Sequence, residues 1–114
     1  MADRRFTERY PKKIPLKFRF GSFMEKGKTE NISSSGMLIK TPMKHVPRIV
    51  IRIEFKLPKN LIVRIDGETR WKGEFSSRWF RMFKKNGLGI RIMKFHSGEQ
   101  IYKELIRDLQ ERRA

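Results

Sequence analysis

An alternating run of residues between 49 and 57 constrains the fold of this chain more than any other feature of its sequence. Every second position carries a large apolar side chain, and these residues are Ile49, Ile51, Ile53, Phe55 and Leu57. Most of the positions between them are polar. A period of two places the apolar side chains on one face of a β-strand and the polar ones on the other. The run therefore predicts a strand with one buried face and one solvated face.

Shorter segments with strand character lie on both sides of this run. They are residues 14–20, 37–40, 61–65 and 88–95. Pro58-Lys59-Asn60 predicts a turn, and Asp66-Gly67 and Asn86-Gly87 are typical of tight hairpins. We expect the first hairpin to pair residues 69–75 with 61–65, and the second to join 79–83 to 88–95.

One amphipathic helix is predicted at the end of the chain, over residues 97–113. Ser97 and Gln100 have the spacing of a capping box, in which each side chain bonds the backbone amide of the other residue. One face of the predicted helix is apolar, and its residues are Ile101, Tyr102, Leu105, Ile106 and Leu109. Short strands followed by one helix predict a mainly β fold, a small antiparallel barrel with the helix over one end or one side.

The length of 114 residues fits one domain, spanning 1–114. Residues 1–13 are polar and cationic without apolar periodicity, which predicts a flexible arm, and residues 14–96 then form the barrel. The sequence contains no cysteine, so disulfides and cysteine metal sites are excluded. No apolar run approaches the roughly 20 residues of a membrane-spanning helix. A cytoplasmic location is the expectation.

The chain is strongly basic. It has 28 Lys and Arg against 12 Asp and Glu, a formal net charge of +16. Such an excess favours polyanions, among them nucleic acid, an anionic membrane surface and phosphorylated small molecules. The charge alone does not choose among them.

The sequence offers no residues for catalysis. Its two histidines, His45 and His96, are far apart and belong to no nucleophile or metal-binding motif, and there is no P-loop. The carboxylates are scattered singly among cations, which favours surface ion pairs over acid–base chemistry. We therefore expect a protein that is not an enzyme and that holds no metal or cofactor.

Two motifs have the chemistry to bind a nucleotide. In the first, Arg5-x-x-x-Arg9, the planar guanidinium groups can grip phosphate or the O6 and N7 acceptors of guanine. In the second, Asn31-x-Ser33-x-x-Gly36, the amide can both accept and donate hydrogen bonds, and the glycine leaves room beside a ligand. Each motif alone is equally typical of a basic tail or a strand-to-strand turn.

Together, in this order and 21 residues apart, the two motifs resemble the paired signature of PilZ domains, R-x-x-x-R and [D/N]-x-S-x-x-G. The segment 87–92 is also similar to the glycine-rich last strand of that family. The resemblance implies a six-stranded antiparallel barrel with a C-terminal helix that binds cyclic di-GMP, a dianionic second messenger in bacteria. It further implies that Arg5 and Arg9 hold guanine edges and phosphates from the arm, while Asn31, Ser33 and Gly36 hold the ligand from the barrel.

The resemblance also implies a mechanism. Ligand binding would order the arm and present a surface to a downstream effector protein. Arg4 precedes the first motif, at a position that influences stoichiometry in the family, and an arginine there favours two cyclic di-GMP molecules per chain. Two alternatives remain open, a protein-interaction module that has lost its ligand and a basic barrel that binds nucleic acid. The second would stack bases on exposed aromatic residues, for which the candidates are Trp71, Trp79, Phe80 and Phe83.

Overall fold

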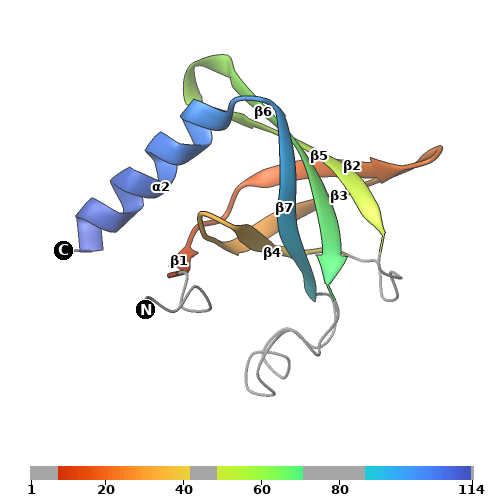
Figure 1. Ribbon diagram of the computed structural model, residues 1–114, viewed down its shortest axis with the longest axis horizontal. Helices are drawn as coiled ribbons and strands as arrows, with labels where there is room; N and C mark the ends of the chain where they lie inside the picture. The colour runs from red at the N-terminus through yellow and green to blue at the C-terminus, as the bar shows by residue number, and fades with distance from the viewer. Residues whose placement is uncertain (1–7, 42–48, 71–86, 114) are drawn as a thin grey trace.

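The computed structural model describes residues 8–41, 49–70 and 87–113, which form seven strands and a C-terminal helix. The elements, labelled as in Figure 1, are β1 (Tyr10–Pro11), β2 (Pro15–Phe20), β3 (Phe23–Ile32), β4 (Gly36–Lys40), β5 (Val50–Leu57), β6 (Leu61–Arg70), β7 (Gly87–Ser97) and α2 (Glu99–Arg113). A 3₁₀ turn at Pro58–Asn60 joins β5 to β6, as the sequence predicts.

The strands close into an antiparallel barrel. Their order is β1-β3-β2-β5-β6-β7-β4, and a further pairing between β3 and β4 completes the ring of six. The short strand β1 adds a seventh member on the edge of β3. Figure 1 shows the ring with α2 leading away from the end of β7. The predicted mainly β class, with a six-stranded antiparallel barrel and a C-terminal helix, is confirmed.

The alternation in residues 49–57 defines the wall of the barrel as expected. Ile51, Ile53 and Phe55 are buried, whereas Arg52 faces solvent on the outer side. Residues of the other strands and of the helix complete the core, and they include Leu16, Phe18, Ile32, Met37, Ile39, Val63, Ile65, Leu88, Ile90, Tyr102 and Ile106. The core is therefore one continuous cluster inside the ring.

Strand β3 is longer than its sequence suggests. The residues from Phe23 to Lys28 show no alternation of apolar and polar side chains, and the sequence predicts no strand there. In the structure they pair with β2, while the second half of β3 pairs with β4 and β1. Between Phe23 and Gly27 β2 is the only strand partner among the described residues, so this half of β3 is a sheet edge with little core to cover.

The predicted hairpin at Asp66-Gly67 is wrong. Both residues lie inside β6, which pairs with β5 on one edge and β7 on the other. A Cβ atom at position 67 would lie 2.4 Å from a methyl carbon of Ile90, so the glycine is needed for close packing and not for a turn. Of the predicted partner segment 69–75, the first two residues continue β6 itself. Residues 71–75 and the segment 79–83 of the second hairpin lie outside the described residues.

The predicted capping box is also wrong. Ser97 is the last residue of β7, and its buried hydroxyl makes no hydrogen bond within the described part of the chain. The helix begins at Glu99, and the Tyr102 amide donates to the carbonyl of Gly98. Tyr102 then inserts between Phe55 of β5 and Phe95 of β7. Because the ring meets different walls of the barrel, α2 covers one open end.

The arm differs from the prediction at its inner end. Tyr10 and Pro11, placed in a flexible arm by the sequence, pair with Ile32 and Asn31 of β3, and the Tyr10 side chain is buried. The polar composition of residues 1–13 hides Tyr10, the aromatic residue whose buried side chain anchors β1. Residues 1–7 lie outside the described residues.

Candidate ligand-binding site

The turn between β3 and β4 is organised by the side chain of Ser33. The Ser33 hydroxyl accepts hydrogen bonds from the backbone amides of Ser35 and Gly36 at 3.2 and 3.0 Å. The backbone amide of Ser33 donates to the carbonyl of Gly36 at 2.8 Å. The side chain is only 1% exposed. Ser33 therefore fixes the shape of the turn from the inside, with its hydroxyl already engaged by the backbone.

Gly36 allows β7 to approach this turn. A Cβ atom there would lie 2.2 Å from the carbonyl oxygen of Ile90, which is backbone and cannot move aside. Next to it, the amide of Ile92 donates to the carbonyl of Ser35 at 2.8 Å. The glycine is thus required by the pairing of β4 with β7, and the turn is held on two sides.

Asn31 and Arg9 meet beside the turn. Arg9 lies just before β1, whose pairing with β3 brings the guanidinium to the Asn31 side chain. Its Nη1 atom donates to Oδ1 of Asn31 at 2.8 Å. The asparagine is 5% exposed, and the arginine is partly buried. Two residues 22 positions apart in the sequence therefore form one polar unit at the mouth of the turn.

Tyr102 links the helix to the same turn. Its hydroxyl donates to the carbonyl of Ser33 at 2.7 Å, and the whole side chain is buried. From the sequence Tyr102 is only one member of the apolar helix face, and nothing in its spacing indicates a bond to a residue 69 positions earlier. The fold thus adds a residue to the site that sequence motifs do not reveal.

Burial shapes the electrostatics of this site. Removal from water lowers the pKa of Arg9 from its usual value, although the nearby Tyr102 acts in the opposite direction. Burial likewise raises the pKa of Tyr102 far above its usual value, against the lowering effects of Arg9 and of the bond to Ser33. At neutral pH the tyrosine is therefore a neutral donor and the arginine the cation of the site.

Four of the six predicted binding residues come together here: Arg9, Asn31, Ser33 and Gly36. The other two, Arg4 and Arg5, lie outside the described residues. The same holds for His45 and for the candidate stacking residues Trp71, Trp79, Phe80 and Phe83. The geometry joins a cation, a side-chain amide and a rigid turn, an arrangement suited to gripping a planar base and its phosphate.

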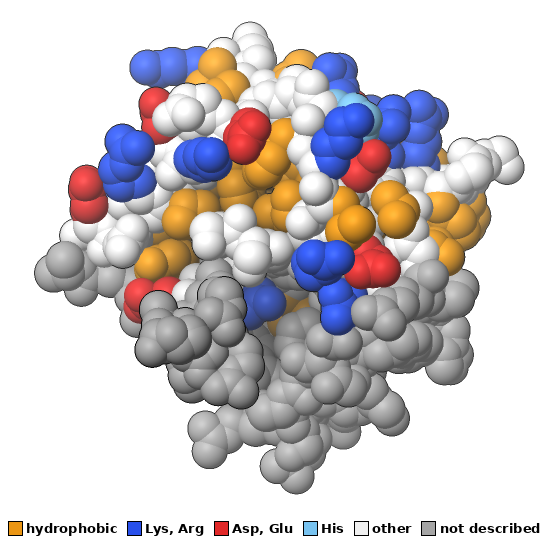
Figure 2. Space-filling view, in the orientation of Figure 1, with side chains coloured by type: hydrophobic (Ala, Val, Ile, Leu, Met, Phe, Trp, Pro, Cys, Tyr) orange, Lys and Arg blue, Asp and Glu red, His pale blue; other side chains and the backbone are white. Residues whose placement is uncertain are grey.

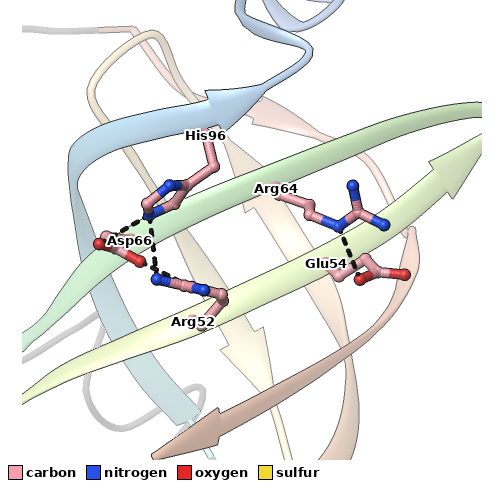
Figure 3. Close-up of polar contacts among 5 residues, drawn as sticks. All are labelled: Arg52, Glu54, Arg64, Asp66 and His96. Carbon is pink, nitrogen blue, oxygen red and sulfur yellow. Dashed lines mark hydrogen bonds and ion pairs between the residues drawn. The ribbon is translucent and has the colours of Figure 1, made fainter.

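A second polar cluster lies on the outer wall, where β5, β6 and β7 run side by side (Figure 3). Asp66 accepts from Nε of Arg52 at 3.2 Å, and its other oxygen lies 2.9 Å from Nε2 of His96. Arg64 and Glu54 form a neighbouring pair at 3.1 Å. The expectation that carboxylates pair with cations at the surface is confirmed. The contact of His96 with Asp66, 30 residues earlier, is not indicated by the sequence.

This outer cluster has the composition of a set of surface ion pairs. No three His, Cys, Asp or Glu side chains gather into a potential metal site within residues 8–41, 49–70 and 87–113. None of the helices in the described part of the chain has the length and apolarity needed to span a bilayer.

Comparison with known proteins agrees with the architecture. A family model described as PilZ domain matches residues 3–111. No curated protein sequence matches the chain.

Two solved structures share the fold. One is the Bacillus subtilis inhibitor of motility, MotI/DgrA, with a TM-score of 0.69 and 15% identity over 98% of this chain and 52% of that one. The chain thus spans about half the length of that protein. The other is the PilZ domain of CeSA from a cellulose-synthesizing bacterium, with a TM-score of 0.58 and 21% identity over 91% of this chain and 99% of that one.

Proposed function

The chain belongs to the PilZ domain family, and we propose that it is a receptor that binds cyclic di-GMP at the turn between β3 and β4 and passes the signal to a protein partner. PilZ domains are ligand-binding receptors and generally not enzymes. The observation that carries the proposal is the bond from Arg9 to Asn31 beside the Ser33–Gly36 turn. It joins one residue of each motif, although the motifs are separate in sequence.

The proposed contacts follow from the chemistry of the two side chains. The side-chain oxygen of Asn31 can accept hydrogen bonds from the N1 and N2 donors of guanine. Doing so weakens its bond with Arg9, whose donors then become available to the ligand. The guanidinium of Arg9 has five donors, so it can hold phosphate or the guanine edge and still face Asn31. Ser33 and Gly36 contribute by fixing the turn, and backbone groups there are positioned without any rearrangement.

The arm completes the proposed site. Arg5 is four residues before Arg9, and the pairing of β1 with β3 anchors the arm next to the turn. In this mechanism Arg5 folds over the ligand and supplies the second guanidinium. Ordering the arm costs conformational entropy, which the new charge-assisted bonds repay. The ordered arm and the ligand then form a surface that was absent before, and the partner recognises it.

We further propose that two ligand molecules bind per chain. Two cyclic di-GMP molecules bring four phosphate charges into one site, and an additional cation is needed beside Arg5 and Arg9. Arg4 supplies this cation, and its guanidinium can stack on a guanine or grip a phosphate. The net charge of +16 lowers the remaining repulsion. The substitution Arg4→Leu should move the end point of a titration from two equivalents toward one.

The test is a set of single variants titrated with cyclic di-GMP. Arg9→Ala and Arg5→Ala each remove charge-assisted bonds, so each should weaken binding roughly tenfold to a hundredfold. Asn31→Ala removes neutral hydrogen bonds to the ligand and should weaken binding by up to roughly tenfold. Lys103→Ala, an exposed cation on α2, is the control and should bind as the unmodified chain does. Unchanged affinity in the Arg5→Ala/Arg9→Ala double variant would refute the proposed site.

A further inference from the structure

The hairpin of β2 and β3 extends past the rest of the barrel and ends in apolar side chains. Phe20 and Phe23 face each other across the turn, with ring centroids 5.2 Å apart. Phe23 is 43% and Met24 53% exposed, among the most exposed large apolar residues in the described part of the chain. Figures 1 and 2 show the projecting hairpin at the right of the molecule, with hydrophobic side chains over it. Phe20 packs against the edge of the core, whereas Phe23 and Met24 remain exposed.

The shank of the same hairpin is cationic. Lys17 lies between Lys26 of β3 and Glu54 of β5, and its neighbour Arg19 lies opposite Arg52 of β5. Like charges directly opposite one another in a sheet are destabilising, so the pairs Lys17–Lys26 and Arg19–Arg52 lower the stability of the fold. Lys17, Arg19 and Lys26 make no ion pair within residues 8–41, 49–70 and 87–113. An external anion would relieve this repulsion.

A hollow of about 210 Å³ lies at the base of this hairpin. Phe18 and Met24 form the apolar part of its wall. The rest of the wall is four cations and one acid, which are Lys17, Arg19, Arg52, Arg64 and Glu54. Arg64 pairs with Glu54, and Arg52 pairs with Asp66 beside the hollow. Glu54 offsets part of the charge opposite Lys17, but the four cations still outnumber the one acid on the wall. The remaining positive charge can hold an anionic group such as a phosphate.

The order of these features along the hairpin matches the cross-section of a lipid leaflet. Phe20 and Phe23 are at the tip, Arg19 and Met24 form the next pair, and the pair of Lys17 and Lys26 is three positions behind Phe20 and Phe23. Three positions in a strand span about 10 Å. That is the depth to which an interfacial apolar group enters a bilayer while its flanking cations stay at the anionic head groups.

We propose that the β2–β3 hairpin is a docking surface for an anionic lipid bilayer. Phe23 and Met24 enter the acyl boundary, and Lys17, Arg19 and Lys26 bind the head-group phosphates. A folded acidic partner would require a matching apolar pocket, whereas a bilayer accepts an apolar tip of any shape. A nucleic acid would contact the cations but would leave Met24 in water. The surface lies apart from the Asn31 turn, so the inference does not depend on the proposed ligand.

Sedimentation with vesicles tests this proposal. The full chain is mixed with vesicles of phosphatidylcholine alone, or of phosphatidylcholine with phosphatidylglycerol. Phe23→Ser/Met24→Ser leaves the net charge unchanged and should weaken binding to the anionic vesicles about tenfold. Lys17→Ala/Lys26→Ala should weaken it roughly fivefold for each lysine removed. Both variants change exposed residues, and equal unfolding midpoints will show that they remain folded.

The matched control is Lys103→Ala/Arg107→Ala, which removes the same charge from α2, on the other side of the barrel in Figure 1. Its binding to anionic vesicles should stay within about twofold of the unmodified chain, because α2 lies on the opposite side from the docked hairpin and its charges are screened by salt. An equal loss in the control would mean diffuse attraction and overturn the proposal. Vesicle binding that is insensitive to Phe23→Ser/Met24→Ser would also overturn it. So would a Lys17→Ala/Lys26→Ala variant that loses binding to a short oligonucleotide but keeps binding to the anionic vesicles.

Discussion

At the scale of single residues, the motif positions of the second signature serve the fold as well as the proposed ligand. The buried Ser33 hydroxyl accepts hydrogen bonds from two backbone amides, while Ser35, two residues on, is exposed. A sequence pattern that marks a binding loop therefore also marks the turn that gives the loop its shape. Loss of such a residue changes stability and binding together.

Ser33→Ala should lower the free energy of unfolding by about 1–3 kcal/mol, because the buried amide of Gly36 and the partly buried amide of Ser35 lose their acceptor. Ser35→Ala removes only a long hydroxyl contact and should cost less than about 0.5 kcal/mol. Denaturant unfolding of both variants measures the difference. Equal stability of the two variants would show that the Ser33 hydroxyl does not hold the turn.

Asp66 gives stability a pH dependence. Burial raises its pKa, but the hydrogen bonds from His96 and Arg52 and their charges outweigh this effect, so the pKa lies below its usual value. The carboxylate therefore stabilises the fold above pH of about 3.9, the pKa of an unfolded aspartate, and this contribution is lost as the pH falls through the folded pKa. Asp66→Asn should be less stable than the unmodified chain at pH 7, with the gap closing in acid. A gap independent of pH would contradict this reading.

At the scale of elements, α2 and the β3–β4 turn act as one unit through Tyr102. The hydroxyl bonds the Ser33 carbonyl, and the ring packs between Phe55 and Phe95. The helix is therefore bonded to the turn that lies next to Asn31. The buried hydrogen bond thus makes the shape of the turn depend on the packing of α2.

Tyr102→Phe deletes only the hydroxyl and should lower the free energy of unfolding by about 1–2 kcal/mol. Tyr102→Leu also removes the ring contacts and should cost more, about 3 kcal/mol. Because the turn loses its support in both, cyclic di-GMP affinity should fall in the same order. Full stability of the Tyr102→Phe variant would mean that the hydroxyl does not link the helix to the turn.

The arm offers a second test at this scale. In the proposed mechanism residues 1–7 gain protection from hydrogen exchange when cyclic di-GMP binds, whereas Tyr10 and Ile32, already paired in the free protein, change little. Exchange measured by mass spectrometry with and without ligand reports both segments. Full protection of residues 1–7 before ligand is added would refute the wrapping of the arm, without affecting the assignment of the ligand.

The sequence predicts the elements that alternate strongly and misses those that depend on distant contacts. The run around Ile53 places the barrel wall correctly, since every second residue enters one core. Asp66-Gly67 is mistaken for a turn because local rules cannot show that Gly67 is packed against Ile90 from another strand. Likewise, Arg9 and Asn31 are each identified by motif, but the contribution of Tyr102 arises only when α2 covers the barrel end.

At the scale of the whole molecule, net charge and local geometry determine different kinds of binding. A charge of +16 attracts any polyanion, and such binding weakens steeply with salt because it depends on counterion release. The Arg9–Asn31 site instead offers donors in a fixed arrangement, and its selectivity should survive at physiological salt. The lysines of the β2–β3 hairpin are on a separate surface, so the proposed ligand and the proposed bilayer would not compete for the same residues.

Calorimetric titration with cyclic di-GMP at physiological salt, with GTP and a short oligonucleotide as comparisons, tests the central claim most directly. The proposed receptor should give saturable binding of cyclic di-GMP, near two equivalents, that changes little as salt is raised. GTP should bind much more weakly, and the oligonucleotide should lose affinity steeply with salt. The account would be contradicted by an absence of saturable cyclic di-GMP binding, or by an oligonucleotide that binds more tightly at physiological salt and displaces it.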